Sequence, residues 1–380
     1  MSTETDARAP RRSPRPRALR GASNSGSGPG SGVDRRSGPR RDRSRSALLV
    51  ALLGAAALLV LSIAVAITLG PADVSLVNVR DIVLNHLGVT QTPVRMSEDA
   101  IVWQERLPRA IVAAATGAGL GICGMIMQSL LRNPLADPFV LGISSGASTG
   151  AVVIGILGIG GTGLGLSGGA FLGAILAFAL VLVLTRLTGG GTDKVVLAGV
   201  ASTQLFSALT SLVVFALADS DETRGVMFWL LGSLEGVRWP DAVLCTVTVL
   251  VGAAITWRTA RVLDAFPFGD EVAASLGIDT AKVRLGLLLL TALITAVLVS
   301  VTGAVGFVGL VLPHAARLVC GHRHSRLLPT TALLGAVFMV WVDAGSRTIF
   351  APTPLPVGVG TALVGVPVFI VLLARRRELR

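Results

Sequence analysis

The chain has 380 residues, of which 52% are apolar and only 14% are charged. Soluble domains carry about a quarter of their residues as Asp, Glu, Lys and Arg, so this composition excludes an ordinary soluble protein. The formal net charge of +11 would suit a nucleic-acid-binding surface if it were spread over a folded domain. Residues 1–46, however, hold twelve of the arginines and only four acidic residues, so no nucleic-acid partner is expected.

Residues 1–46 are rich in Pro, Gly, Ser and Arg and nearly free of large apolar side chains. Such a segment has little apolar surface to bury, so we expect a disordered basic tail in the cytoplasm. The apolar run that follows, residues 47–69, is too long for a signal-peptide core and lacks a convincing small-residue cleavage site. We interpret it as a retained first helix, which divides the chain into a tail, 1–46, and a transmembrane domain, 47–376.

Apolar runs predict an all-α membrane protein, a polytopic bundle of about ten helices that each cross about 30 Å of hydrocarbon. The third, eighth and tenth runs contain enough Gly and Pro to be broken or tilted. Glycines four residues apart, such as Gly117 and Gly121, predict close helix packing. The predicted spans are 47–70, 106–131, 138–158, 168–186, 195–218, 239–257, 284–303, 305–320, 327–346 and 358–374.

The positions of Lys and Arg predict the orientation, because cytoplasmic loops retain positive charge. With both termini placed in the cytoplasm, fourteen of these residues outside the tail fall on the inner side and seven on the outer side. We therefore predict a multi-pass protein of the cytoplasmic (inner) membrane, in contact with the lipid bilayer. The seven outer residues are Arg80, Arg95, Arg106, Arg109, Arg224, Arg238 and Arg347.

The spans contain few groups that could carry chemistry, so we predict no enzyme, no metal site and no cofactor in this chain. Cys123, Cys245 and Cys320 lack metal-ligand spacing and are interpreted as small core residues. His322 and His324 are interpreted as part of a solvated inner loop.

The energy source must then lie outside the chain if it is a pump. Both lysines, Lys194 and Lys282, are followed by Val, so neither completes a P-loop. Asp343, near the outer end of the ninth span, is almost the only carboxylate that could couple an ion gradient. We favour a partner ATPase that binds ATP; a gradient-driven secondary transporter is the alternative, and an intramembrane enzyme or a channel is a third, less favoured one.

Arginines at outer helix ends run against the usual charge asymmetry. Arg106 and Arg109 open the second span as Arg-Leu-Pro-Arg, and Arg347 closes the ninth. They could snorkel or contact lipid phosphate. The functional alternative is a ring that pairs with carboxylates of an external delivery protein, for which the planar guanidinium is well suited.

The longest inner loop, residues 258–283, contains a short amphipathic stretch near 269–277. Asp270 and Glu271 begin this stretch, Ala274 and Leu276 supply apolar groups, and Gly277 is a natural helix stop. It could lie on the lipid surface as an interfacial helix. The sharper hypothesis is a docking site for a cytoplasmic ATPase.

Several stretches, in order between about residues 100 and 375, resemble the permeases of iron-siderophore, haem and vitamin B12 ABC importers. The most specific are the two long blocks. They are Gln128-Ser-Leu-Leu-Arg-Asn133-Pro134-Leu-Ala-Asp137-Pro138 and Gly303-Ala-Val-Gly-Phe-Val-Gly309-Leu-Val-Leu-Pro313-His314-Ala-Ala-Arg317; shorter matches are Arg106-Leu-Pro-Arg109, Trp229-Leu-Leu-Gly232-Ser233-Leu, Ala274-Ser-Leu276-Gly277-Ile and Pro356-Val-Gly358.

The resemblance implies a ten-helix permease that pairs with a second copy or a paralogue and moves substrate by alternating access along the dimer axis. It also implies two cytoplasmic ATPases at residues 270–277 and an extracytoplasmic substrate-binding protein docked on Arg106, Arg109 and Arg347. Ferric siderophore is the favoured cargo, with cobalamin or haem as alternatives. Ser202, Gln204 and Ser207 of the fifth span are candidate path residues. The chain departs from the family at Pro354, where a Glu is common before Pro-Val-Gly.

Overall fold

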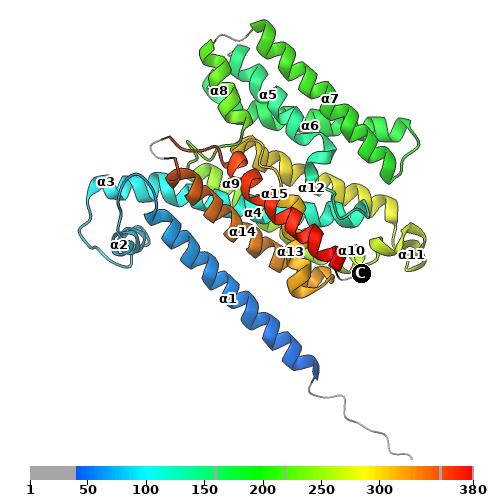
Figure 1. The fold of residues 1–380 in the computed structure, drawn as a ribbon, viewed down its shortest axis with the longest axis horizontal. Coiled ribbons are helices and arrows are strands. Elements are labelled where there is room, and N and C mark those ends of the chain that lie inside the picture. Colours follow the sequence, from blue (N-terminus) through cyan, green and yellow to red (C-terminus); the bar gives the residue numbers. More distant parts are fainter. Residues whose placement is uncertain (1–39, 158–160, 218–219, 351–352, 379–380) are drawn as a thin grey trace, which may run out of the picture. The chain divides into compact units, whose positions relative to one another are not determined.

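The computed structural model of the chain describes residues 40–157, 161–217, 220–350 and 353–378 (Figure 1). Within these ranges every regular element is a helix and no β-strand occurs, which confirms the all-α class. Residues 46–380 belong to one unit. The predicted disordered tail falls largely in residues 1–39, outside the described residues.

The first half of the chain forms a helical entry segment, a long central helix and three packed helices after it. The bounds are α1 Arg40–Thr68, α2 Leu76–His86, α3 Met96–Asp99, the π-helix η1 Ala100–Arg106, α4 Leu107–Leu130, the 3₁₀-helix η2 Pro138–Leu141, α5 Ile143–Leu157, α6 Gly161–Leu187 and α7 Thr192–Leu217.

The second half contains three long helices, α9, α12 and α14, and several short ones between them. The bounds are α8 Ser220–Leu230, α9 Trp239–Arg258, α10 Ala260–Leu263, the 3₁₀-helix η3 Phe266–Phe268, α11 Asp270–Ser275, α12 Thr280–Thr302, α13 Val308–Cys320, α14 His324–Thr348 and α15 Val357–Glu378.

Each predicted span contains a helix, and the described residues include seven helical segments long and apolar enough to cross a membrane. Three apolar helices are shorter: α5, α13 and residues 357–372 of α15. These are the third, eighth and tenth predicted spans, where Gly and Pro predicted interruption. At a rise of about 1.5 Å per residue, α13 is about 20 Å long, less than the hydrocarbon thickness. The number of complete crossings therefore stays a prediction.

The chain between α12 and α13 leaves helical geometry at Gly303, whose φ is +67°, and returns to it after Phe307, whose φ is +68°. The Ser233 amide donates to the Thr302 carbonyl over 2.9 Å, so a neighbouring loop supplies one of the missing helical hydrogen bonds. A Cβ at Gly303 would lie 2.5 Å from the Trp229 carbonyl oxygen. Glycine is therefore required where these two loops meet.

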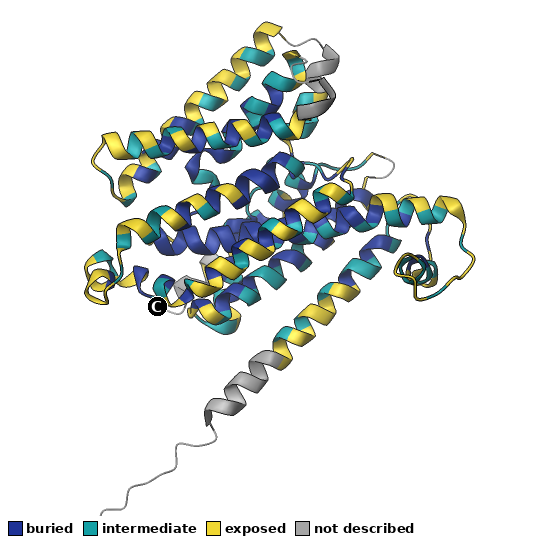
Figure 2. Cartoon of the chain, turned by 180° about the vertical axis from the view of Figure 1, so that it is seen from behind, coloured by how far each residue is buried: buried dark blue, intermediate teal, exposed yellow. Residues whose placement is uncertain are grey.

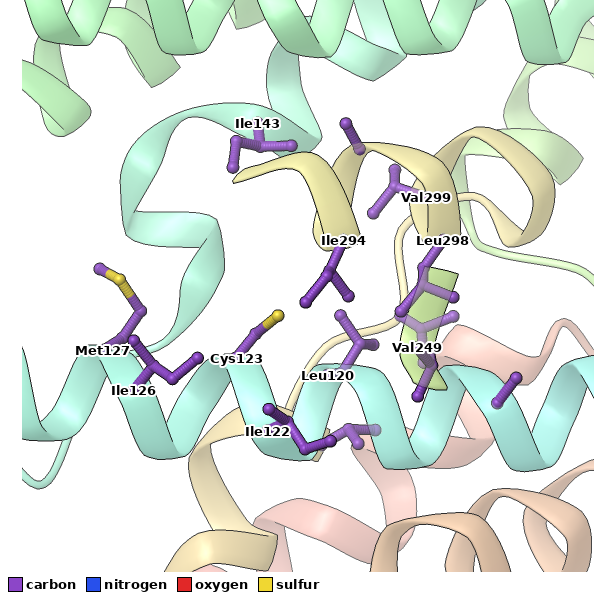
Figure 3. Packing of buried hydrophobic residues seen from close by; sticks show 14 of the residues in the cluster. Leu120, Ile122, Cys123, Ile126, Met127, Ile143, Val249, Ile294, Leu298 and Val299 are labelled. Atoms are coloured by element: carbon purple, nitrogen blue, oxygen red, sulfur yellow. The ribbon is translucent and has the colours of Figure 1, made fainter. Parts of the chain in front are cut away.

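Helix α4 forms the centre of the core, because nearly all of its side chains are buried. It packs against α9, α12, α13 and α14. Figure 3 shows Leu120 and Cys123 of α4 facing Ile294 and Leu298 of α12. The prediction of small core cysteines is confirmed for Cys123 and Cys245, which are buried, whereas Cys320 is half-buried.

Glycines allow the backbones of these helices to approach closely. A Cβ at Gly117 of α4 would collide with the Gly335 carbonyl of α14, and one at Gly124 with the Gly309 carbonyl of α13. Gly146 of α5 meets Gly173 of α6 in the same way. Helices α5, α6 and α7 pack against one another and join the rest through α12 (Figure 1).

The segment between α1 and α4 folds into helices that the hydropathy pattern did not predict. The His86 and Trp103 rings stack 4.0 Å apart between centroids, and the Trp239 indole donates to the Trp103 carbonyl over 2.8 Å. Trp103 also packs against a separate apolar cluster that includes Ile67 and Ile82. These helices are short and contain charged residues, so hydropathy alone could not reveal them.

Candidate functional site

The guanidinium of Arg106, at the end of the π-helix η1, lies against the C-terminal end of α1. Its Nη1 donates to the Ile67 carbonyl over 2.8 Å, and its Nη2 donates to the Ala72 carbonyl over 2.7 Å. The last carbonyls of a helix lack partners within the helix and carry partial negative charge, so a cation there is stabilising. Arg106 is only 4% exposed and ties α1 to the start of α4.

Arg109 and Arg347 share the carboxylate of Asp343. Arg109 Nε donates to Asp343 Oδ1 over 2.9 Å, and Arg347 Nε lies 3.2 Å from Asp343 Oδ2. Arg347 also donates to the Ala66 and Leu69 carbonyls at the end of α1. All three charged side chains are buried, which connects α1, α4 and α14 through one network.

The three predicted docking arginines are buried in this structure. Arg106, Arg109 and Arg347 do come together at one end of the bundle, but they do not extend as a free ring. They turn inward because the end of α1 and Asp343 provide acceptors inside the chain. Their role in docking is not tested by this geometry and stays a prediction.

The predicted amphipathic stretch of the inner loop is confirmed as a short helix, α11. Gly269, with φ +106°, precedes the helix and Gly277, with φ +80°, follows it. The Gly277 amide donates to the Ala274 carbonyl, a hydrogen bond that ends the helix. Glycine favours such a helix end because it adopts positive φ without strain. Asp270 accepts from Arg284 of α12 over 2.7 Å, and this ion pair fixes the start of α11 to the long helix after it.

The buried side of α11 is supplied by Ala273, whereas Glu271, Ala274, Leu276 and Gly277 are exposed. Leu276 is 67% exposed, and Phe268, just before the helix, is 74% exposed. Exposed apolar side chains at both ends of a short helix are suited to contact with another surface.

The two long sequence blocks meet between α4 and α13. Gln128 Nε2 donates to the Gly309 and Leu310 carbonyls over 3.2 Å each, and its Oε1 accepts from Arg317 Nη1 over 2.6 Å. A Cβ at Gly309 would lie 3.0 Å from Asp137 Oδ2. The blocks therefore form one contact that joins distant parts of the chain.

Asn133 and Asp137 stabilise the turns between α4 and η2. Asn133 Oδ1 accepts from the Leu135 amide and Asp137 Oδ1 from the Phe139 amide, each over 2.9 Å. Burial raises the pKa of Asp137 to about 6, an effect that the Phe139 hydrogen bond opposes. Pro134 is exposed, whereas Pro138 is buried at the start of η2.

Pro313 and His314 lie inside α13, and both are buried. Both residues are part of the second long sequence block. The departure at Pro354 lies in the loop before α15, where the next residue, Leu355, donates its amide to the Ser346 carbonyl over 2.9 Å.

The candidate path residues of α7 do not share one environment. Ser202 is fully buried and donates to the Ala177 carbonyl of α6 over 3.2 Å, so it packs between helices and cannot line an open surface in this conformation. Gln204 and Ser207 are exposed on α7, a helix with much exposed surface (Figure 2). The structure thus removes Ser202 from the set of surface residues and leaves the other two in it.

His324 was predicted in a solvated loop, and this prediction is wrong. The ring is buried at the start of α14, where Nε2 lies 2.7 Å from Ser129 Oγ and Nδ1 lies 2.7 Å from Asp264 Oδ1. Asp264 also accepts from the His324 amide over 2.9 Å. No local sequence pattern indicates this cluster, because the partners of His324 lie 60 and 195 positions away. His322 is exposed, as predicted.

These features define a multi-pass helical bundle, with seven helices, within the described residues, that are long and apolar enough to cross a membrane and with the two long sequence blocks joined inside it. The chain belongs to the FecCD transport family, whose model matches residues 58–375.

Relatives with different cargoes are similar to this chain. It is 41% identical over 282 residues to the cobalamin import system permease protein BtuC of Halobacterium salinarum, covering 74% of each chain. It is 33% identical to the iron(3+)-hydroxamate import system permease protein FhuB of Bacillus subtilis, covering 87% of this chain and 84% of the relative. It is 36% identical to the hemin transport system permease protein HmuU of Yersinia pestis, covering 72% and 83%.

The fold also resembles that of a solved inward-facing ABC transporter classed as metal-chelate type. The TM-score is 0.75 at 29% identity, with 85% of this chain and 98% of the other covered. The chain is accordingly an ABC transporter permease by sequence and by fold.

Proposed function

We propose that this chain is the permease subunit of a binding-protein-dependent ABC importer that carries ferric siderophores. The observation that carries the ATP-driven part of the proposal is α11. This short helix presents Leu276 at an exposed loop tip, while the Asp270–Arg284 ion pair links it to α12. A push on α11 would therefore reach a long helix of the bundle.

Two cytoplasmic ATPases would contact Asp270, Glu271, Ala274, Leu276 and Gly277 and would bind the ATP. A second permease copy or a paralogue would complete the path. The exposed positions Gln204 and Ser207 of α7 support a surface available to such a partner or to cargo. Alternating access would then change the opening between the two subunits.

Ten crossings with both termini in the cytoplasm and the basic tail 1–46 on the inner side remain part of the proposal. The distribution of Lys and Arg supports this orientation in the cytoplasmic membrane. The helices found at all ten predicted spans support the count.

An extracytoplasmic binding protein would dock at the end of the bundle that holds Arg106, Arg109 and Arg347. Because these side chains hold α1 in place, replacing them with Glu tests docking and folding together. Uptake and binding-protein association should both be lost in Arg106→Glu with Arg109→Glu. Substitution of the exposed Arg238, which lines one cavity together with Arg109 and has no part in the buried network, provides a docking test in which that network is untouched.

The relatives carry cobalamin, hydroxamate-bound iron or haem, so the cargo is decided by experiment. Vesicles with the chain and its partner proteins should take up a radiolabelled ferric hydroxamate in an ATP-dependent manner. Preferential uptake of labelled cobalamin or haem would overturn the siderophore assignment but would leave the proposed permease function in place.

The runner-up is a gradient-driven secondary transporter, in which Asp343 would carry the coupled ion. Its two ion pairs with Arg109 and Arg347 argue against this, because guanidinium groups of the same chain already occupy both carboxylate oxygens. Uptake that stops when the proton gradient is dissipated at constant ATP would favour the runner-up.

A further inference from the structure

The start of α14 is capped by a residue from another helix. The N-cap residue of α14 is Arg323, whose guanidinium is only a donor and cannot accept from the helix amides. The carboxylate of Asp264, at the end of α10, accepts instead: its Oδ1 takes a hydrogen bond of 2.9 Å from the His324 amide and one of 2.7 Å from the ring Nδ1. A carboxylate suits this place because unpaired amides and partial positive charge meet at a helix N-terminus. The first turn of α14 therefore depends on a residue 60 positions earlier in the chain.

The ring of His324 extends this contact to a third helix. Its Nε2 forms a hydrogen bond of 2.7 Å with Ser129 Oγ in the last turn of α4. Ser129 and His324 are both buried, and α10 packs against α4 and α14. Because both ring nitrogens have a partner, rotation of the imidazole would break the contact to α10, the contact to α4, or both. We call Asp264, His324 and Ser129 the inner link.

Helices α4 and α14 are joined again near their opposite ends. Arg109 of α4 pairs with Asp343 of α14 over 2.9 Å. Between this ion pair and the inner link, the backbones of Gly117 and Gly335 approach so closely that a Cβ on either residue would collide with the carbonyl of the other. The inner link therefore joins α10 to a helix pair that is in close contact along its length and reaches the end of the bundle with the buried arginines.

Helix α11, the proposed ATPase contact, is attached to the bundle on two sides. It packs against α12, where Asp270 accepts from Arg284 over 2.7 Å. It also packs against η3, which begins two residues after Asp264. Leu263 and Phe266, on either side of Asp264, are buried, so this short segment is anchored in the core. A displacement of α11 therefore has a second route into the bundle, through Asp264.

We propose that Asp264 and His324 are positioning residues that connect α11 to α14 and α4, so that a movement that the ATPase imposes on α11 reaches both helices. This inference rests on the proposed function, which supplies the ATPase. Apolar contacts have no preferred direction and let packed helices slide, whereas hydrogen bonds of 2.7 Å hold donor and acceptor in a defined direction. The inner link therefore keeps the segment before α11 in register with both helices.

The test uses the full-length chain with its partner ATPase in bilayer discs, and hydrogen exchange measured by mass spectrometry with and without ATP. In the parent, ATP should change amide exchange in the first turn of α14 and the last turn of α4. Asp264→Ala should still co-purify with the ATPase, because the ion pair of α11 with Arg284 is kept. Its ATP-dependent difference should fall at least about fivefold at both places, the lower end of typical coupling between sites. Asp264→Asn should restore the difference, because the amide oxygen can accept both hydrogen bonds.

A second variant separates the two contacts of His324. Ser129→Ala removes the contact to α4 and keeps the cap on α14. The ATP-dependent difference should shrink at the end of α4 and persist at the start of α14, a pattern that general destabilisation would not produce. This variant decides the question if Asp264→Ala does not fold. His322→Ala, at an exposed position in the same loop, is the matched control and should respond as the parent does.

The outcomes separate this inference from the proposed function. A parent chain that does not retain the ATPase would count against the proposed function itself. If the parent retains the ATPase, an unchanged response in Asp264→Ala would overturn the positioning role. Equal loss in Asp264→Asn, or equal responses at the two helix ends in Ser129→Ala, would overturn it as well.

Discussion

Arg109 of α4 and Asp343 of α14 lie 234 positions apart and form an ion pair of 2.9 Å with both side chains almost fully buried. Arg347 lies on the other oxygen of the same carboxylate. A carboxylate between two guanidinium groups leaves the network with one excess positive charge, which the carbonyls at the end of α1 help to stabilise through Arg347. The order of this end of the bundle therefore depends on Asp343.

Asp343→Asn should be strongly destabilising, because it leaves two buried guanidinium groups without their counter-ion. Breaking a buried pair costs about 3–5 kcal/mol. Arg109→Met should cost less, because Asp343 keeps its ion pair with Arg347. Thermal unfolding in detergent measures both, and equal losses in the two variants would contradict the shared network.

Gly117→Ala should separate α4 from α14, because the added methyl group collides with the Gly335 carbonyl. Overpacking of this kind costs about 1–3 kcal/mol. Gly286→Ala in α12 is the matched control: a Cβ there meets no atom within 4 Å, and alanine favours a helix interior by about 0.5–1 kcal/mol. If both variants unfold at the same temperature, the close contact is not needed.

Leu276→Asp should abolish co-purification with the partner ATPase and ATP-dependent uptake, while the chain still inserts and folds. The side chain is 67% exposed, so its replacement removes a contact surface without opening the core. Val89→Asp provides the control, because Val89 is 68% exposed in the loop after α2, on the predicted outer side. Normal co-purification with Leu276→Asp would count against α11 as the contact.

Asp137 should make the stability of the chain pH-dependent. Its pKa is raised to about 6 in the folded chain, above the value of about 3.9 in an unfolded one, so the folded state binds the proton more tightly. The contribution to stability is fully present below about pH 4 and is lost as the pH rises through 6.

The measured quantity is the free energy of unfolding between pH 4 and 7.5, compared with Asp137→Asn. The amide oxygen of Asn can still accept from the Phe139 amide, so the variant removes the titration and keeps the turn. A difference of about 1–3 kcal/mol should develop between the two chains over this range. Parallel curves would show that Asp137 does not titrate there.

The periodic and compositional parts of the fold could be predicted from the sequence. Runs of apolar residues indicated every long helix. Gly and Pro predicted that the spans of α5, α13 and α15 would be broken or tilted; each of them is one continuous helix, but with a shorter apolar stretch than the other spans. Gly277 marked the end of α11 correctly. These features depend on a residue and its near neighbours, which is the information that a local pattern contains.

The environments of individual polar residues could not be predicted in the same way. Arg106 faces carbonyls 34 to 39 positions earlier, and His324 is buried because Asp264 and Ser129 lie beside it. Ser202 belonged to a predicted path surface, but a close approach of α6 and α7 buries it. In each case the partner that determines the environment of the side chain is distant in the chain, and a hydropathy pattern contains no information about it.

The hydrogen bonds from Arg106 and Arg347 to the end of α1 have a consequence for how the chain is assembled in the membrane. The bond from Arg347 to the Ala66 carbonyl joins residues 281 positions apart, so it cannot form until α14 has been synthesised and inserted. Much of the apolar surface of α1 is exposed even in the complete fold, as Leu53 and Val60 show at 69% and 68%. The C-terminal end of α1, the first long helix of the chain, is therefore among the last parts of the bundle to gain its partners.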